Sequence, residues 1–398
     1  MKKQLLTLTA ILLLISAFGQ VPDTVKNIDK KIKDQVLSDI NVSLETKSKS
    51  IDATVATLDK RADELDKAIV ASKSANEKAD KLLERVQSLE TRQTTLEENE
   101  LNVFQANFQS ATINLVSMER EIKPLILFNS TKEFFSLLTE TSNPMSYQGY
   151  QDWYKKFYKY IEDEKGNEAS LNVLSSMIRL TGDWTKEAPF AGPIANELFS
   201  GIAAFINTLG RKKKDIRIES EKMFLLTAKV SQFTHDRNLI ETEWSSITKE
   251  LQELEKHYDK ILKANLKLLT TDTTEFRNRF TKENDANNRY NYLTTLKEIS
   301  SKVVSGQKQT NQKNWKEVIY YQLMDVQSLK IRFGTIAFKI SENIARYKNL
   351  IIKYKNDTHI GPRVVSLESK LTNLKETFDR AFEPMEYINS ATRMYKVN

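Results

Sequence analysis

Residues 51–70 read IDATVATLDKRADELDKAIV and place apolar side chains at alternating steps of four and three residues. The apolar positions are Ile51, Val55, Leu58, Ala62, Leu65 and Ile69. This spacing is the heptad pattern of a coiled coil, in which each helix buries one apolar stripe against a partner helix. The same register extends to Leu83 and Val86, so the sequence predicts one long, unbroken coiled-coil helix within residues 20–123.

Comparable patterns fill most of the second half of the chain. The runs Ile240–Ile261, Val326–Tyr354 and Leu367–Ile388 all space apolar residues by three and four. They predict long helices of the rod over residues 211–305 and a C-terminal helical pair, 306–398, that packs on the rod. Within these regions, Thr270–Thr274 should interrupt a helix, and Pro384 should kink the last one.

Glycine and proline are concentrated in the middle of the chain. Residues 124–210 hold six of the ten Gly and four of the seven Pro. Because these residues interrupt regular structure, residues 124–210 are predicted to form a separate helical head. The expected fold is therefore all-α, an elongated coiled-coil or long-helix bundle with a Gly/Pro-punctuated helical head region.

The first nineteen residues, MKKQLLTLTAILLLISAFG, have the parts of a secretory signal peptide. Two lysines precede a short apolar core, and Ala17 and Gly19 are small residues at the positions that a signal peptidase reads. We expect cleavage after Gly19 and export to the periplasm or cell envelope, or secretion. The chain has no Cys, which excludes disulfides and a lipid-modified cysteine.

No pattern typical of an enzyme is found in the sequence. The three histidines are His235, His257 and His359, and none lies at metal-ligand spacing from a second ligand. There is no phosphate-binding glycine loop or nucleophile elbow. We therefore expect no enzymatic activity, no cofactor, no metal and no small-molecule substrate. The formal charge of +7 is mild for a chain of this length and does not indicate a nucleic-acid partner.

Two segments of the head are candidates for a membrane or partner contact. The first, residues 147–160, carries an aromatic stripe that includes Trp153, Tyr154 and Phe157. A stripe at helical spacing is typical of a core face, whereas the abundance of Tyr and Trp favours an interface. Both interpretations stay open at the level of sequence.

The second segment, residues 189–210, is mostly apolar and contains one formal charge, Glu197. Its apolar face consists of Ile194, Leu198, Phe199, Ile202, Phe205, Ile206 and Leu209, and the cations Arg211, Lys212, Lys213 and Lys214 follow directly. The segment is too polar for a stable membrane span, so we expect its apolar face to be buried in the resting protein. Anionic headgroups could still attract the four cations if the segment is released.

A long helix, an apolar broken head and further long helices together resemble the layout of the ClyA-like α-helical pore-forming toxins. The resemblance covers most of the mature chain and lies in layout alone. It implies that residues 189–210 would be the element that inserts into a membrane, with residues 147–160 beside it. That segment is shorter and more polar than a hairpin that crosses a bilayer requires.

The sequence thus favours a non-enzymatic exported coiled-coil protein that acts as a cell-envelope scaffold or adaptor, or as a secreted interaction protein. Its head, 124–210, would bind a protein partner, and its coiled coils could also associate with one another. The alternative is an α-helical pore-forming toxin, or a component of one, in which residues 189–210 enter the membrane.

Overall fold

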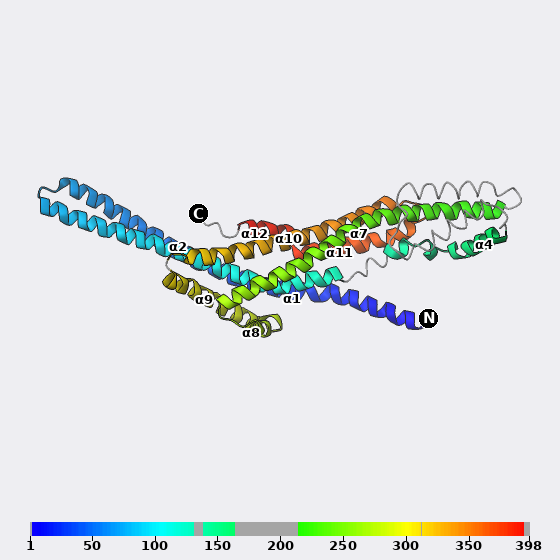
Figure 1. Ribbon diagram of the computed structural model, residues 1–398, viewed down its shortest axis with the longest axis horizontal. Helices are drawn as coiled ribbons and strands as arrows, with labels where there is room; N and C mark the ends of the chain where they lie inside the picture. Colours follow the sequence, from blue (N-terminus) through cyan, green and yellow to red (C-terminus); the bar gives the residue numbers. More distant parts are fainter. Residues whose placement is uncertain (1, 131–137, 164–213, 312, 394–398) are drawn as a thin grey trace. The chain divides into compact units, whose positions relative to one another are not determined.

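The computed structural model describes residues 2–130, 138–163, 214–311 and 313–393, and in these ranges the chain is helical without a β-strand (Figure 1). The predicted all-α fold class is therefore confirmed. The chain divides into two compact units. Unit 1 comprises residues 1–124, 253–335 and 385–398, and unit 2 comprises residues 125–252 and 336–384.

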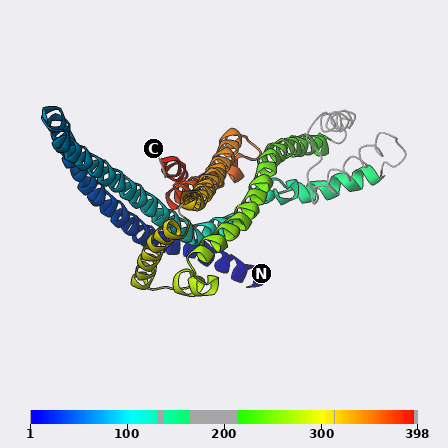
Figure 2. The same cartoon turned by 60° about the vertical axis from the view of Figure 1, so that its left-hand side comes forward.

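Unit 1 contains a hairpin of two long helices. Helix α1 (Lys2–Ala71) is followed by α2 (Ala75–Ser130), which runs back along α1 (Figures 1 and 2). Ion pairs between the two helices fix the antiparallel order, with Arg85 on Asp66 at 3.0 Å and Arg92 on Asp59 at 2.8 Å. The prediction of one unbroken helix up to residue 123 is therefore wrong, since the chain reverses at residues 72–74.

Serine side chains at the reversal explain the break. The Ser72 hydroxyl donates to the Ala68 carbonyl oxygen at 2.8 Å, and Ser74 accepts the Glu77 backbone N–H at 3.2 Å. Ser74 thereby caps the start of α2, which is the usual role of serine at a helix N-terminus. Such side-chain bonds compete with the helical backbone bonds and allow a turn without Gly or Pro.

Capped turns also separate the shorter helices of unit 1. Asp272 accepts the backbone N–H groups of Thr274 at 2.7 Å and Glu275 at 3.1 Å, and so starts α8 (Thr273–Phe276). A π-helical segment, η4 (Arg277–Thr281), follows, and then α9 (Ala286–Thr310), which packs against α1. The predicted interruption at Thr270–Thr274 is therefore present.

Four further helices belong to the second half of the chain. Helix α7 (Lys214–Leu268) precedes α8, and α10 (Trp315–Tyr354) leads to α11 (Gly361–Phe382) and α12 (Pro384–Arg393). Glu383 adopts a left-handed conformation with φ 39° between α11 and α12. Pro384 therefore does not kink one helix, as the sequence suggested, but begins a new one, because proline is well suited to the first turn of a helix.

Unit 2 forms around aromatic contacts between its own helices. It includes η1 (Pro144–Ser146) and α4 (Tyr150–Asp163), the first part of α7, the last part of α10, and α11. The rings of Phe128 and Phe378 lie 4.9 Å apart, and those of Phe233 and Tyr354 lie 5.4 Å apart. Gly149 has φ 79°, a conformation that glycine adopts easily, and it lets the chain turn into α4.

Candidate functional site

Most of the predicted contact residues lie outside the described part of the chain. These are Ile194, Leu198, Phe199, Ile202, Phe205, Ile206, Leu209, Arg211, Lys212 and Lys213. Lys214 is the first residue of α7. The placement of the apolar segment and its cations therefore stays a prediction from sequence, and the described head residues are 124–130 and 138–163.

Helix α4 turns its aromatic stripe toward α7. Trp153 is 1% exposed, and its indole N–H donates to the Ser220 hydroxyl at 3.0 Å. Tyr150 shares a 2.9 Å hydrogen bond with the Thr227 hydroxyl. The stripe is thus bound to α7 by polar groups as well as by apolar burial, which satisfies the polar atoms of Trp and Tyr in a buried setting.

Phe224 of α7 completes this aromatic cluster. Its ring meets Trp153 edge-on at 5.3 Å and Phe157 at 5.8 Å, and Phe157 is fully buried. Such T-shaped pairs add favourable electrostatics to the area that the rings bury. Of the two interpretations of the stripe, burial of Trp153 and Phe157 in unit 2 favours the core face for these two side chains, and their contact with a partner stays a prediction from sequence.

The outward face of α4 carries three lysines and two carboxylates, Asp152 and Asp163. Lys155, Lys156 and Lys159 are exposed, whereas Tyr154 is half-buried beside them. The Tyr154 ring makes a tilted pair with Tyr158, with ring centroids 6.1 Å apart. Of the three aromatic residues named as contact candidates, Tyr154 alone borders the exposed face. We define Lys155, Lys156, Lys159 and Tyr154 as the α4 surface.

Arg363 of α11 holds the segment that leads into α4. Its guanidinium donates to the hydroxyl of Ser146 at 2.7 Å and also to the Ser146 carbonyl oxygen. The same group lies 4.3 Å from the centre of the Tyr147 ring, a cation–π contact. Burial raises the pKa of Tyr147, whose hydroxyl donates to the Thr141 carbonyl oxygen at 2.9 Å. Sequence reasoning missed Arg363, because nothing in the pattern links it to residues more than two hundred positions away.

Unit 1 contains a buried charged cluster that the sequence did not indicate. Lys33 of α1 pairs with Glu121 of α2 at 2.9 Å, and the Tyr387 hydroxyl of α12 donates to the other oxygen of Glu121. The ammonium of Lys330 on α10 lies 5.1 Å from the centre of the Tyr387 ring and donates to Asn114 at 3.3 Å. Four helices therefore meet at one set of polar side chains.

The pKa values of this cluster follow from burial and from Glu121. Burial lowers the pKa of Lys330 to about 8, and the charge of Lys33 acts in the same direction. Burial also opposes the charged form of Lys33, but the Glu121 carboxylate outweighs it and raises the pKa of Lys33. Burial and the same carboxylate raise the pKa of Tyr387 far above its ordinary value. Glu121 is thus the acceptor around which the cluster is organised.

A second group of charged side chains joins α1, α2 and α9. The Asp29 carboxylate contacts Arg120 at 2.7 Å and Arg289 at 3.0 Å. Arg120 also donates to the backbone carbonyl oxygens of Phe280 and Thr281, at 3.1 Å each. Arg289, 3% exposed, donates to the Glu283 carbonyl oxygen at 2.9 Å. These bonds tie the turn before α9 to the hairpin.

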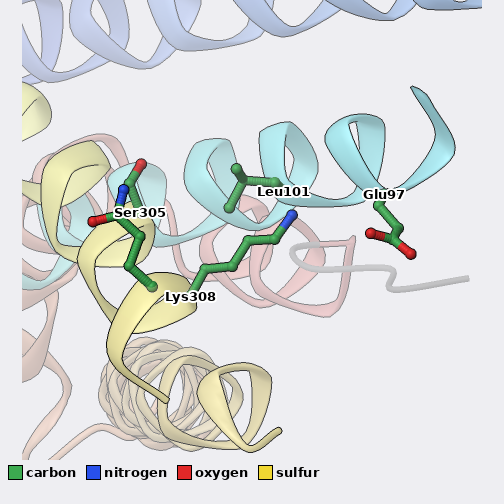
Figure 3. A pocket seen from close by; sticks show the side chains of 5 residues that line it. Glu97, Leu101, Ser305 and Lys308 are labelled. Atoms are coloured by element: carbon green, nitrogen blue, oxygen red, sulfur yellow. The ribbon is translucent and has the colours of Figure 1, made fainter. Parts of the chain in front are cut away.

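An open groove between α2 and α9 is lined by Glu97, Leu101, Ser305, Lys308 and Gln309, with a volume of about 590 Å³. Figure 3 shows the Lys308 side chain extended toward Leu101. One carboxylate, Glu97, and one ammonium, Lys308, are among the lining groups. It does not contain any of the predicted contact residues.

The described residues contain neither a group of metal-binding side chains nor a helix that could cross a membrane. In ranges 2–130, 138–163, 214–311 and 313–393, no three His, Cys, Asp or Glu side chains are grouped as metal ligands. The half-buried histidines His235, His257 and His359 lie on α7 and on the turn before α11. No helix in the described part of the chain combines the length and apolar character that a membrane span requires.

Comparison of the chain with protein-family models, with curated proteins and with solved structures found no match.

Proposed function

We propose that this chain is a non-enzymatic exported interaction protein, a cell-envelope scaffold or secreted adaptor, that binds a protein partner through its head. The observation that carries the proposal is the α4 surface, which the buried half of α4 holds in place. Trp153 and its hydrogen bond to Ser220 fix the rotation of α4 on α7. The three lysines consequently have a defined position from which to meet acidic groups on a partner.

The exposed lysines of α4 outnumber its two exposed carboxylates, Asp152 and Asp163. Lys155 and Lys159 are four residues apart, where like charges destabilise a helix by about 0.2–0.5 kcal/mol, but Asp152 and Asp163 lie three or four residues from these lysines and offset that cost. Tyr154, half-buried beside them, adds a rigid amphipathic ring of the kind enriched in protein interfaces. A basic surface with an aromatic neighbour suits a partner that presents carboxylates.

The test is affinity capture from the envelope fraction and the culture medium with three versions of the chain. One is the wild type, and one carries Lys155→Glu, Lys156→Glu and Lys159→Glu. The third, the matched control, carries Lys49→Glu, Lys60→Glu and Lys67→Glu on the exposed face of α1, with the same change in charge. We expect the wild type and the control to retain the same protein and the α4 variant to lose it. Equal capture by all three versions would refute the proposal that the α4 surface binds the partner.

Export is a separate part of the proposal and has its own test. In the full-length chain, residues 2–19 form the start of α1. If these residues are a signal peptide, N-terminal sequencing of the exported protein will give Gln20 as the first residue. A mature chain that begins at Met1 would contradict the proposed export route.

The alternative, a pore-forming toxin or toxin component, has one observation in its favour. The apolar segment 189–210 lies between α4, which ends at Asp163, and the 55-residue helix α7. An apolar element that adjoins a long helix is the layout that suggested such a toxin. Dye release from anionic liposomes, abolished by Phe205→Asp, would support this alternative, whereas a lack of release from the wild type would favour the interaction protein.

A further inference from the structure

The distal part of α2 carries an exposed apolar stripe beside its contact with α1. Leu82, Val86 and Leu89 are each 48% exposed, and Leu96 is 42% exposed. These residues follow the 4–3–7 spacing of one heptad seam, with Gln93 at the position between Leu89 and Leu96. Clustered exposed apolar residues at regular spacing mark a surface that another chain covers. We call these five residues the α2 stripe.

The hairpin itself does not cover the α2 stripe. Helix α1 meets α2 through a different and more polar set of positions, in which Ser88 is 8% exposed and Arg85 and Arg92 bind carboxylates of α1. Residues 88 and 92 lie about a third of a turn around the helix from the α2 stripe, at about 100° per residue. Helix α1 thus contacts the polar face of α2 and leaves the apolar face exposed.

The identity of the stripe residues specifies how many helices it accommodates. In heptad terms, Val86 and Gln93 occupy a positions, and Leu82, Leu89 and Leu96 occupy d positions. A β-branched residue at a with leucine at d favours two parallel strands, and a polar residue at one a position fixes the register. The pattern therefore fits one additional helix in register, rather than a larger bundle.

The flanking charges indicate which helix that is. Arg85 and Arg92 fall at g positions on one side of the stripe, and Glu90 and Glu97 fall at e positions on the other. In a parallel pair, each g residue meets the e residue five positions later in the partner. Two copies of α2 would therefore bring Glu90 beside Arg85 and Glu97 beside Arg92, in both directions. Each arginine already binds a carboxylate of α1 in its own chain, Asp66 or Asp59, and would gain a second carboxylate from the partner copy.

Antiparallel pairing of two copies would be repulsive. It would place g beside g and e beside e, which brings arginine against arginine and glutamate against glutamate. We infer that the α2 stripe is a homodimer interface, in which the occupant is α2 of a second copy of this chain, parallel and in register. A two-fold axis along the paired helices relates the copies, so the contact is closed and self-complementary.

The length of the stripe makes the dimer concentration-dependent. Residues 82–96 supply about two heptads, fewer than the three or four that mark a stable coiled coil. Beyond the stripe the helix enters the core of unit 1, where Phe104 is 4% exposed and Phe108 is fully buried. The contact is therefore confined to the distal part of the hairpin.

The experiment is sedimentation velocity of the full mature chain over a wide range of concentration. We expect the mass to rise from one copy to two for the wild type. A Glu90→Arg, Glu97→Arg variant should associate at least about tenfold more weakly, because four attractive charge pairs become repulsive. Neither glutamate forms an ion pair with α1, so the variant should fold like the wild type. Its helical signal in circular dichroism checks that it is folded. A wild type that stays monomeric, or a variant that dimerises like the wild type, overturns the inference.

Cysteine cross-linking tests orientation and register. The chain has no cysteine of its own, so a single introduced thiol can link only to its counterpart. Val86→Cys should give a disulfide-linked dimer under mild oxidation, because a positions face each other in a parallel pair. Gln87→Cys, which lies one residue further and away from the seam, should stay monomeric. Equal cross-linking of both variants, or of neither, would contradict the parallel arrangement.

Discussion

The indole N–H of Trp153 on α4 donates to the hydroxyl of Ser220 on α7 at 3.0 Å, and both residues are almost completely buried. This bond joins two segments that are 67 residues apart in the chain. It fixes the rotation of α4 and therefore the direction in which its lysines point. The α4 surface depends on this contact, although neither residue is part of that surface.

Replacement of Ser220 by alanine should destabilise the chain by about 1–3 kcal/mol, because the buried indole N–H loses its acceptor. Urea unfolding followed by circular dichroism measures the change. A Trp153→Phe chain has no indole N–H, so Ser220→Ala leaves no donor unpaired in it. Ser220→Ala should therefore destabilise Trp153→Phe less than it destabilises the wild type. Equal destabilisation of the two proteins would show that Ser220 does not stabilise the chain through this hydrogen bond.

Loss of the Asp29 carboxylate should be among the most damaging single changes in unit 1. Asp29→Ala leaves Arg120 and Arg289 without their shared carboxylate, although both keep backbone carbonyl acceptors, and the loss of this part-buried pair should cost about 1–3 kcal/mol. The measurement is urea unfolding of the purified chain. Asp52→Asn, an exposed change on the same helix, is the control and should stay within about 0.5 kcal/mol of the wild type.

The fold class was accessible from sequence because heptad spacing reports which face of a helix is apolar. On α1 the seam residues Ile51, Ala62 and Leu65 are 6–8% exposed, as the pattern predicts. On α2 the same register places Leu83 and Val86 at 60% and 48% exposed. Periodicity identifies an apolar face but does not say which helix covers it, so the reversal at residues 72–74 was missed.

The candidate site was less accessible for a related reason. Three-residue and four-residue steps predicted the aromatic stripe of α4, but its polar partners Ser220 and Thr227 carry no signal in the sequence. The cluster around Glu121 was missed because charged residues on a helix rich in lysine and glutamate are expected to face solvent. The predicted segment 189–210 remains a hypothesis from sequence alone.

Stability should depend on pH through Lys330, whose pKa falls from 10.5 in the unfolded chain to about 8 in the fold. Below about pH 8 both states hold the proton, and the fold bears the cost of a buried charge. Between these two pKa values the unfolded chain binds a proton that the folded chain does not, so this contribution to stability rises with pH.

We therefore expect the unfolding free energy of the wild type, relative to that of Lys330→Met, to increase from about pH 8 to pH 10. The increase should be at most about 1.4 kcal/mol per pH unit. Urea titrations of both proteins across this interval give the comparison directly. Because Tyr387 is present in both proteins, its own titration largely cancels in the difference. A constant difference between the two proteins would mean that Lys330 does not titrate in this window.

Two glycines in helices should respond in opposite directions to the same substitution. A Cβ on Gly334 of α10 would lie 2.8 Å from Cγ1 and 3.3 Å from the backbone nitrogen of Ile388 on α12, whereas a Cβ on Gly306 of α9 meets nothing within 4 Å. Gly334→Ala should cost about 1–3 kcal/mol by displacing α12. Gly306→Ala should stabilise the chain by about 0.5–1 kcal/mol through helix propensity.

Thermal unfolding of the two alanine variants provides the test. If Gly334→Ala stabilises the chain as much as Gly306→Ala does, then α12 does not pack against α10 as closely as described. Limited proteolysis after α11 adds a local readout, since a displaced α12 should be cleaved faster in the Gly334 variant alone.

The position of α12 at the end of the chain has a consequence for the order of folding. The hairpin pair of Arg85 and Asp66 closes a separation of only 19 residues, whereas Tyr387 reaches Glu121 across 266 residues. Short loops close at a smaller entropic cost, and local contacts form first. The hairpin can therefore assemble as soon as its two helices have left the ribosome. Lys33 and Glu121 gain the Tyr387 hydroxyl only after synthesis of α12, so the interior of unit 1 stays incomplete until α12 packs on the hairpin.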